Sequence, residues 1–211
     1  MPSQLHLVKQ LIGTVWPALA LLVLAACSSP LAKPAYLAYL TDPKHGLTHT
    51  QEVNGATISC SYRPPDLLLS QELAVRPATT PVVLDSLRRM YASKTYCTLT
   101  LSQGGAEIES PLIQNSDAYS QALAYLNTGI TQDVILTSNA VPTDSVTALA
   151  ATYPRQYGAT GFSTVLLVFD THALDLNNGF RVTFRGDKFN LGAVRFAFSG
   201  RDLDALPRLQ L

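Results

Sequence analysis

The sequence predicts a single α+β domain built on one antiparallel sheet of about six strands with two to four helices. Several short segments alternate apolar and polar residues, as strands with one buried face do. Amphipathic helical patterns lie between these segments, but without the strict strand–helix alternation that parallel sheets require. A β-sandwich decorated with helices is the alternative that the same segments allow.

Strands are expected where the alternation is regular. In residues 180–185 three apolar residues alternate with polar ones, and residues 194–198 repeat the pattern, so that these two segments are expected to pair as a hairpin. The run 165–169 is apolar throughout, which indicates a strand covered on both faces. The expected strands are residues 56–62, 97–101, 133–137, 163–170, 180–185 and 194–198.

Helices are expected from their start and stop signals. Asn115 or Ser116 can cap a helix that ends before Gly129, and Pro81 suits the first turn of another helix. Residues 138–160 show no sustained period and are expected to form a loop. The expected helices are residues 34–42, 66–73, 81–92 and 115–127.

The first 26 residues have the composition of a secretory signal. Lys9 is their one firm charge, and a mostly apolar run follows from Leu11 to Leu24. That run has about 14 residues, fewer than the ~20 that a helix needs to cross a bilayer. It ends in the sequence Leu24-Ala25-Ala26-Cys27.

This last motif resembles the lipobox of bacterial lipoproteins. The resemblance implies that the chain is cleaved before Cys27 and that the Cys27 thiol carries a diacylglyceryl group. Two or three acyl chains anchor a protein stably, because each buried methylene contributes roughly 0.8 kcal/mol. The implied organisation is a signal peptide at residues 1–26, a lipidated tether at 27–34 and one globular domain at 35–211. No aspartate and no acidic cluster follow Cys27, which by the same resemblance places the protein on the outer membrane, facing the periplasm.

Composition and residue spacing indicate the size of the domain and argue against nucleic-acid binding and metal binding. Cleavage after residue 26 would leave 185 of the 211 residues, enough for one domain with a substantial core. Because Lys9 is the only charged residue removed, 14 basic and 15 acidic residues remain, and this balance gives no electrostatic basis for nucleic-acid binding. His45 and His49 have helical ligand spacing, but Gly46 opposes a helix there, so no metal site is expected.

Two cysteines remain once Cys27 carries lipid. Cys60 and Cys97 both fall on the apolar faces of expected strands, and the bacterial envelope is oxidising. A disulfide between them would close a loop of about 37 residues and contribute roughly 3–4 kcal/mol. Two buried, unpaired thiols are the alternative.

Two groups of charged side chains are candidates for a functional site. Arg181, Arg185 and Arg195 are expected on the strand face opposite the phenylalanines, where they would form a basic stripe able to grip a carboxylate or phosphate. An ordinary hydrated sheet face is the alternative. Glu107 and Glu109 share one side of an expected strand, and we expect a solvated face there rather than a catalytic carboxylate pair.

Segments such as Val53-Asn54-Gly55 and Tyr62-Arg63-Pro64-Pro65-Asp66 resemble a group of uncharacterised bacterial lipoproteins, a resemblance that carries no activity. The expected function is that of a membrane-anchored envelope lipoprotein with a non-enzymatic role in assembly, scaffolding or partner binding. Its expected partners are the lipid bilayer and an envelope protein. A periplasmic small-ligand or lipid-binding module is the alternative, and a hydrolase comes third. No catalytic residue, cofactor or metal is predicted.

Overall fold

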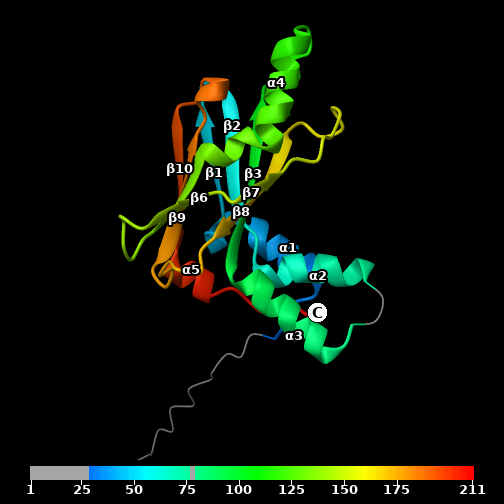
Figure 1. The fold of residues 1–211 in the computed structure, drawn as a ribbon, viewed down its shortest axis with the longest axis vertical. Coiled ribbons are helices and arrows are strands. Elements are labelled where there is room, and N and C mark those ends of the chain that lie inside the picture. Colours follow the sequence, from blue (N-terminus) through cyan, green and yellow to red (C-terminus); the bar gives the residue numbers. More distant parts are fainter. Residues whose placement is uncertain (1–28, 77–78) are drawn as a thin grey trace, which may run out of the picture.

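A computed structural model describes residues 29–76 and 79–211 (Figure 1). These residues form two antiparallel sheets and five α-helices, which confirms the predicted α+β class. The predicted signal peptide and Cys27 lie outside the described residues. Every helix within the two described ranges is too short or too polar to span a bilayer.

The larger sheet is built around one long central strand, β3 (Lys94–Gln103), which pairs with β2 on one side and β8 on the other. All strand pairings in the larger sheet are antiparallel. The strand order of this sheet is β1 (Thr48–Val53), β2 (Ala56–Tyr62), β3, β8 (Ser163–Asp170) and β7 (Ala150–Thr152), and the short strand β4 (Ala106–Glu107) pairs with the end of β3.

The smaller sheet has the order β10 (Ala193–Ser199), β9 (Gly179–Arg185), β5 (Val134–Ser138) and β6 (Ser145–Thr147). The predicted hairpin is confirmed, because β9 and β10 pair in register along their whole length, with Phe180 opposite Phe198. The six expected strands do not form one sheet: β2, β3 and β8 lie in the larger sheet, and β5, β9 and β10 lie in the smaller one. The domain therefore also has the two-layered packing of the sandwich alternative.

The inner faces of the two sheets enclose one hydrophobic core. The rings of Tyr62 and Phe180, from different sheets, lie 5.8 Å apart at their centroids. Burying one aliphatic or aromatic side chain contributes roughly 1.5–3 kcal/mol, so this core is the main source of stability. Its fully buried members include Ile58, Leu99, Leu136, Leu167, Val182, Phe184 and Phe196.

A short segment between β6 and β7 carries the chain from one sheet to the other. The Ala148 amide donates to the carbonyl of Val134 in the smaller sheet at 3.0 Å, and the next amide, of Leu149, donates to Val168 in the larger sheet at 2.7 Å. The opposite edge is closed by the Gln51 side chain, whose amide donates to the Arg195 carbonyl. The two layers are thus joined along both edges.

Some expectations for the strands were wrong. Residues 138–160 are not all loop, because they contain β6 and β7, and β1 has no counterpart among the expected strands. Asn54 and Gly55 form the β1–β2 hairpin turn, where both residues have positive φ (50° and 79°), as a type I′ turn requires. Strand β8 is fully buried on one face only, while Leu166 and Val168 on the other are partly covered.

The helices gather mostly at the two ends of the sheets (Figure 1). The expected cap of α4 is confirmed: the Asn115 side chain accepts from the Ala118 amide at 3.0 Å. The helices are α1 (Lys33–Thr41), α2 (Pro65–Val75), α3 (Pro81–Ala92), α4 (Ser116–Asn127) and α5 (Gly200–Asp204), with short 3-10 turns at Pro43–His45, Ser110–Leu112, Gly129–Gln132 and Asp187–Phe189.

Leu31, four residues before position 35, is joined to the C-terminal segment of the domain by a backbone bridge. The Leu31 amide donates to the Arg208 carbonyl at 2.8 Å, and the Gln210 amide donates to the Leu31 carbonyl at 2.9 Å. This bridge fixes the start of the domain beside α1 and α2. A second, smaller apolar cluster forms there from Tyr36, Leu40, Leu47, Leu67 and Leu209.

Candidate functional site

The three arginines of the predicted basic stripe lie on the outer face of the smaller sheet. Phe180, Val182 and Phe184 point into the core, so the residues that alternate with them, Arg181, Thr183 and Arg185, point outward. Along β10 the same alternation exposes Arg195 between two buried neighbours. The described helices leave this outer face open in Figure 1.

Arg185 is engaged within the domain. Its Nη2 donates to the Gln132 carbonyl at 2.8 Å, and its Nε lies 3.8 Å from the Asp133 carboxylate. Half of the Arg185 side chain is still exposed, but its charge already has a partner. Arg185 therefore lies in the basic stripe, but its charge is less available to a ligand than the sequence implies.

Arg181 and Arg195 keep their charge available. Arg181 lies opposite Ala197 and Arg195 opposite Thr183, so the two arginines are diagonal neighbours across the hairpin. Backbone positions in that relation are about 7–8 Å apart, within reach of long side chains. In residues 29–76 and 79–211 neither guanidinium has a carboxylate within 4.0 Å. Two adjacent forked donors can bind one carboxylate or phosphate group.

Cys60 and Cys97 lie in neighbouring strands on the core side of the larger sheet, both fully buried. The structure holds them as free thiols, so the disulfide is not formed there. They are diagonal neighbours, since Cys97 lies opposite Tyr62 and Cys60 opposite Leu99. Burial and the adjacent Cys60 thiol raise the pKa of Cys97. Because the thiolate is the reactive form, a bond would form before the sheet closes over the pair.

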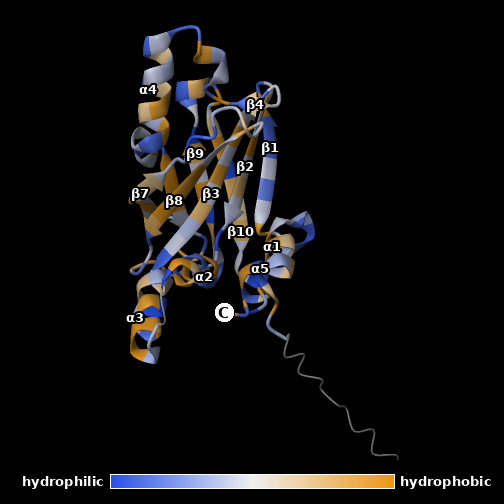
Figure 2. Cartoon of the chain, turned by 90° about the vertical axis from the view of Figure 1, so that its right-hand side faces the viewer, coloured by the Kyte–Doolittle hydropathy of each residue, from blue (hydrophilic) through white to orange (hydrophobic). Residues whose placement is uncertain are grey.

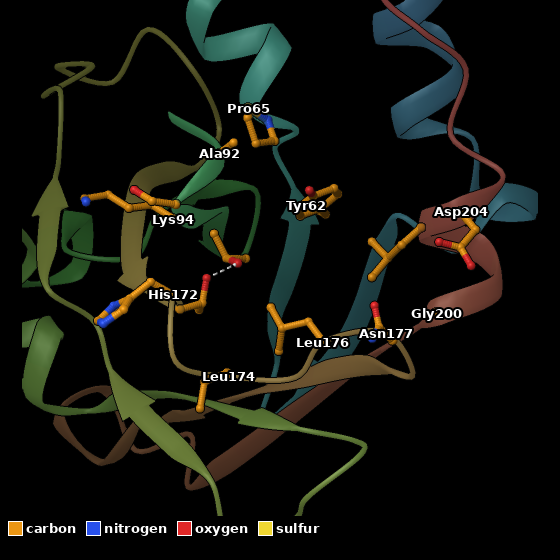
Figure 3. Close-up of a pocket in the computed structure, with 14 residues that line it drawn as sticks. Tyr62, Pro65, Ala92, Lys94, His172, Leu174, Leu176, Asn177, Gly200 and Asp204 are labelled. Carbon is orange, nitrogen blue, oxygen red and sulfur yellow. Dashed lines mark hydrogen bonds between the residues drawn. The ribbon is translucent and has the colours of Figure 1, made fainter. Parts of the chain in front are cut away.

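An open groove of about 410 Å³ lies at the helical end of the domain (Figure 3). Its floor holds two buried hydroxyls, those of Thr95 and Thr171, which are 2.9 Å apart and hydrogen-bond to each other. Tyr62 and Asp204 lie on one side of the groove, and Lys94 and His172 on the other (Figure 3). The size falls within the range of small-ligand sites, roughly 300–1,000 Å³.

An aspartate–histidine pair stands at the rim of this groove. The His172 Nδ1 lies 2.7 Å from the Asp170 carboxylate, and this hydrogen bond holds the pKa of Asp170 below its usual range. An imidazole oriented by a carboxylate is one component of a general base. In Figure 3 the ring of His172 and the chain of Lys94 extend away from the opposite wall. The groove thus lacks converging polar groups around a reacting atom.

The prediction of a solvated face for Glu107 and Glu109 was wrong. Glu107 is 4% exposed and Glu109 is 1% exposed. The chain after β4 turns inward and places both carboxylates beneath the segment 153–163. Glu107 accepts a hydrogen bond from the Gly158 amide at 2.9 Å.

The buried Glu109 carboxylate is the centre of a hydrogen-bond network. It accepts one hydrogen bond from the Tyr153 phenol and one from the Ser163 hydroxyl. The Ser163 oxygen in turn accepts from the Ile108 amide at 3.1 Å. Burial, together with the bond to Glu109, raises the pKa of Tyr153, so the phenol remains a neutral donor. Neither Glu107 nor Glu109 lines the groove, and the network holds the segment 153–163 against the larger sheet.

The two histidines with helical spacing are separated by the fold. His45 stacks on Tyr39 with ring centroids 3.6 Å apart, and His49 contacts the edge of Phe198. The buried Nε2 of His49 has no hydrogen-bond partner in the described part of the chain. Within the same residues no group of three or more His, Cys, Asp or Glu is placed to hold a metal ion.

Comparison with known proteins adds no relative: no family model, curated protein or solved structure matches this chain.

We expect protein isolated from an oxidising compartment to contain the Cys60–Cys97 bond. The measurement is intact mass after denaturation with an alkylating reagent and without reductant. The bonded protein lacks two hydrogens and takes up no reagent at these positions, whereas alkylation of both cysteines would contradict the prediction. The Cys60→Ser variant, which cannot form the bond, calibrates the reagent.

Glu109→Ala is expected to lower the free energy of unfolding by about 2–4 kcal/mol, because it leaves two buried hydroxyl donors without their acceptor. The matched control is Glu52→Ala, which removes an exposed carboxylate from β1 and should change stability by no more than about 0.5 kcal/mol. The measurement is the urea unfolding of the two variants, compared with that of the natural chain. Equal midpoints would show that the buried network contributes nothing to stability.

Proposed function

We propose that this chain is a lipoprotein of the bacterial outer membrane, held by acyl chains on Cys27, and that its periplasmic domain is a non-enzymatic module that binds an acidic envelope protein. The lipobox-like motif supports the anchor. A short attachment is supported by Leu31, four residues after the cysteine, whose backbone is hydrogen-bonded to the C-terminal segment of the domain.

The observation that carries the binding proposal is the pair Arg181 and Arg195. The third arginine of this face, Arg185, already has a carboxylate partner in Asp133. Arg181 and Arg195 have no carboxylate partner among the described residues. They lie on a sheet face that the described helices leave uncovered (Figure 1) and are separated only by the small side chains of Thr183 and Ala197. A protein surface with aligned carboxylates would find two forked donors already oriented by one hairpin.

The groove supports a second candidate, a module that binds a small polar ligand. Its volume of about 410 Å³ is large enough, and hydroxyls form its floor. The space between the sheets gives no support to a lipid-carrying cavity, because the inner-facing side chains of both sheets fill it. A hydrolase has the least support, since the ring of His172 extends away from the opposite wall of the groove (Figure 3).

The anchor is tested by Cys27→Ser. The variant should move from the membrane fraction to the soluble periplasmic fraction or keep its uncleaved signal, because serine cannot carry the thioether. Mass spectrometry of the peptide that begins at residue 27 should show the diacylglyceryl group in the natural chain. An unmodified Cys27, or a mature form that retains residues before it, would refute the anchor.

The binding face is tested by reversing charge in the double variant Arg181→Glu, Arg195→Glu. Crosslinking of the membrane-bound protein in intact cells should lose its main partner in this variant. The charge-matched control is Lys33→Glu, Lys44→Glu, which changes two exposed lysines outside the β9–β10 hairpin and should keep the partner. Identical crosslinks in both double variants would exclude this face as the binding site.

A further inference from the structure

The helical end of the domain is fixed close to Cys27. The Leu31 backbone is held by its two hydrogen bonds to residues 208 and 210. Leu31 is four positions after Cys27, and a fully extended chain gains at most about 3.6 Å per residue. The backbone of the lipid-bearing cysteine therefore lies within roughly 14 Å of Leu31. A tether this short keeps the end that carries Leu31 next to any bilayer that holds the acyl chains.

The α2–α3 hairpin belongs to this same end. Leu67 of α2 packs in the cluster that includes Tyr36 of α1 and Leu209, beside Leu31. The hairpin is held together by the Tyr91 phenol of α3, which donates to the Glu72 carboxylate of α2. In Figures 1 and 2, α3 lies at the end of the domain where the described chain begins, while α4 points to the opposite end.

This hairpin exposes more apolar surface than its own packing uses. Only Leu87 of α3 is buried. Val75 is 82% exposed, Val82 75%, Met90 50% and Val83 40%. Residues 83 and 90 of α3 are seven apart and point in nearly the same direction, and residue 82 lies about a quarter of a turn from them, so the three share one half of the helix surface. Figure 2 shows the hydrophobic segments along α3.

The charged residues of the hairpin are mostly paired with each other. Arg76 pairs with Glu72 on α2, and Arg88 lies 3.7 Å from Asp85 on α3. These pairs leave little net charge for attraction to anionic lipids. A surface of this kind enters the interfacial region of a bilayer through its apolar side chains, and the contact adds to that of the acyl chains.

We propose that the α2–α3 hairpin is a second membrane contact, which lies on the bilayer with Val75, Val82, Val83 and Met90 among the lipid headgroups and upper acyl chains. This inference rests on the proposed lipidation of Cys27. The contact fixes the orientation of the domain: α4 points away from the membrane, and the sheets stand between the two. The contact does not depend on the fraction of anionic lipid, because the hairpin carries paired charges.

Single tryptophans test this orientation. The only tryptophan of the chain, Trp16, precedes the predicted cleavage site, so the mature protein has none. Val82→Trp places a reporter on the hairpin. Ile113→Trp is the matched control, because Ile113 is also an exposed apolar residue, at 57%, and immediately follows the 3-10 turn that precedes α4 at the far end. Each lipidated variant is reconstituted into phosphatidylethanolamine–phosphatidylglycerol vesicles with brominated acyl chains.

The proposal is supported if emission from the Val82→Trp variant shifts to shorter wavelength and is quenched by the brominated lipid, while the Ile113→Trp variant keeps its full intensity. The quenching should persist when phosphatidylglycerol is omitted. Two results overturn it: an unquenched Val82→Trp variant that still sediments with the vesicles, or equal quenching of both reporters. Failure of the anchor is recognised separately, because the purified protein would then lack the diacylglyceryl mass on Cys27 before any vesicles are added.

Discussion

The alternation of side chains along β9 and β10 is the constraint on which both the core and the basic face depend. Phe180, Val182 and Phe184 must point inward to meet the larger sheet, and a strand has only two faces. The intervening residues are therefore forced outward. A shift of the hairpin register by one residue would bury Arg195 beside the phenylalanines and expose the core. The stability of the sandwich thus fixes the position of the arginines, whatever they bind.

The elements that the sequence predicts are those whose own residues determine them. The hairpin of β9 and β10 and the helix after Asn115 carry strong periodic patterns and caps, and both are present. β1 was not predicted because it is polar at nearly every position, and it pairs only as an edge beside β2. β6 and β7 have three residues each, and their pairing depends on the sheet switch at Ala148 and Leu149, which no local pattern records.

The candidate site also has features that the sequence predicts and features that it does not. The outward position of Arg181 and Arg195 follows from strand periodicity, but the engagement of Arg185 by Asp133 needed the placement of the turn before β5. The burial of Glu109 was missed because its two donors, Tyr153 and Ser163, lie 44 and 54 residues further along the chain. Glutamate at the end of a short strand is usually solvated, and only the tertiary arrangement reverses that preference here.

The bridge between Leu31 and the segment 208–210 has a mechanical consequence for a domain attached through Cys27. Tension from the attachment point enters the fold at Leu31 and is resisted first by two backbone hydrogen bonds. Helix α1 bears load only after this bridge separates. Because so small a contact opens more readily than the enclosed sheets, tension on such an attachment would lengthen it while the core stays folded.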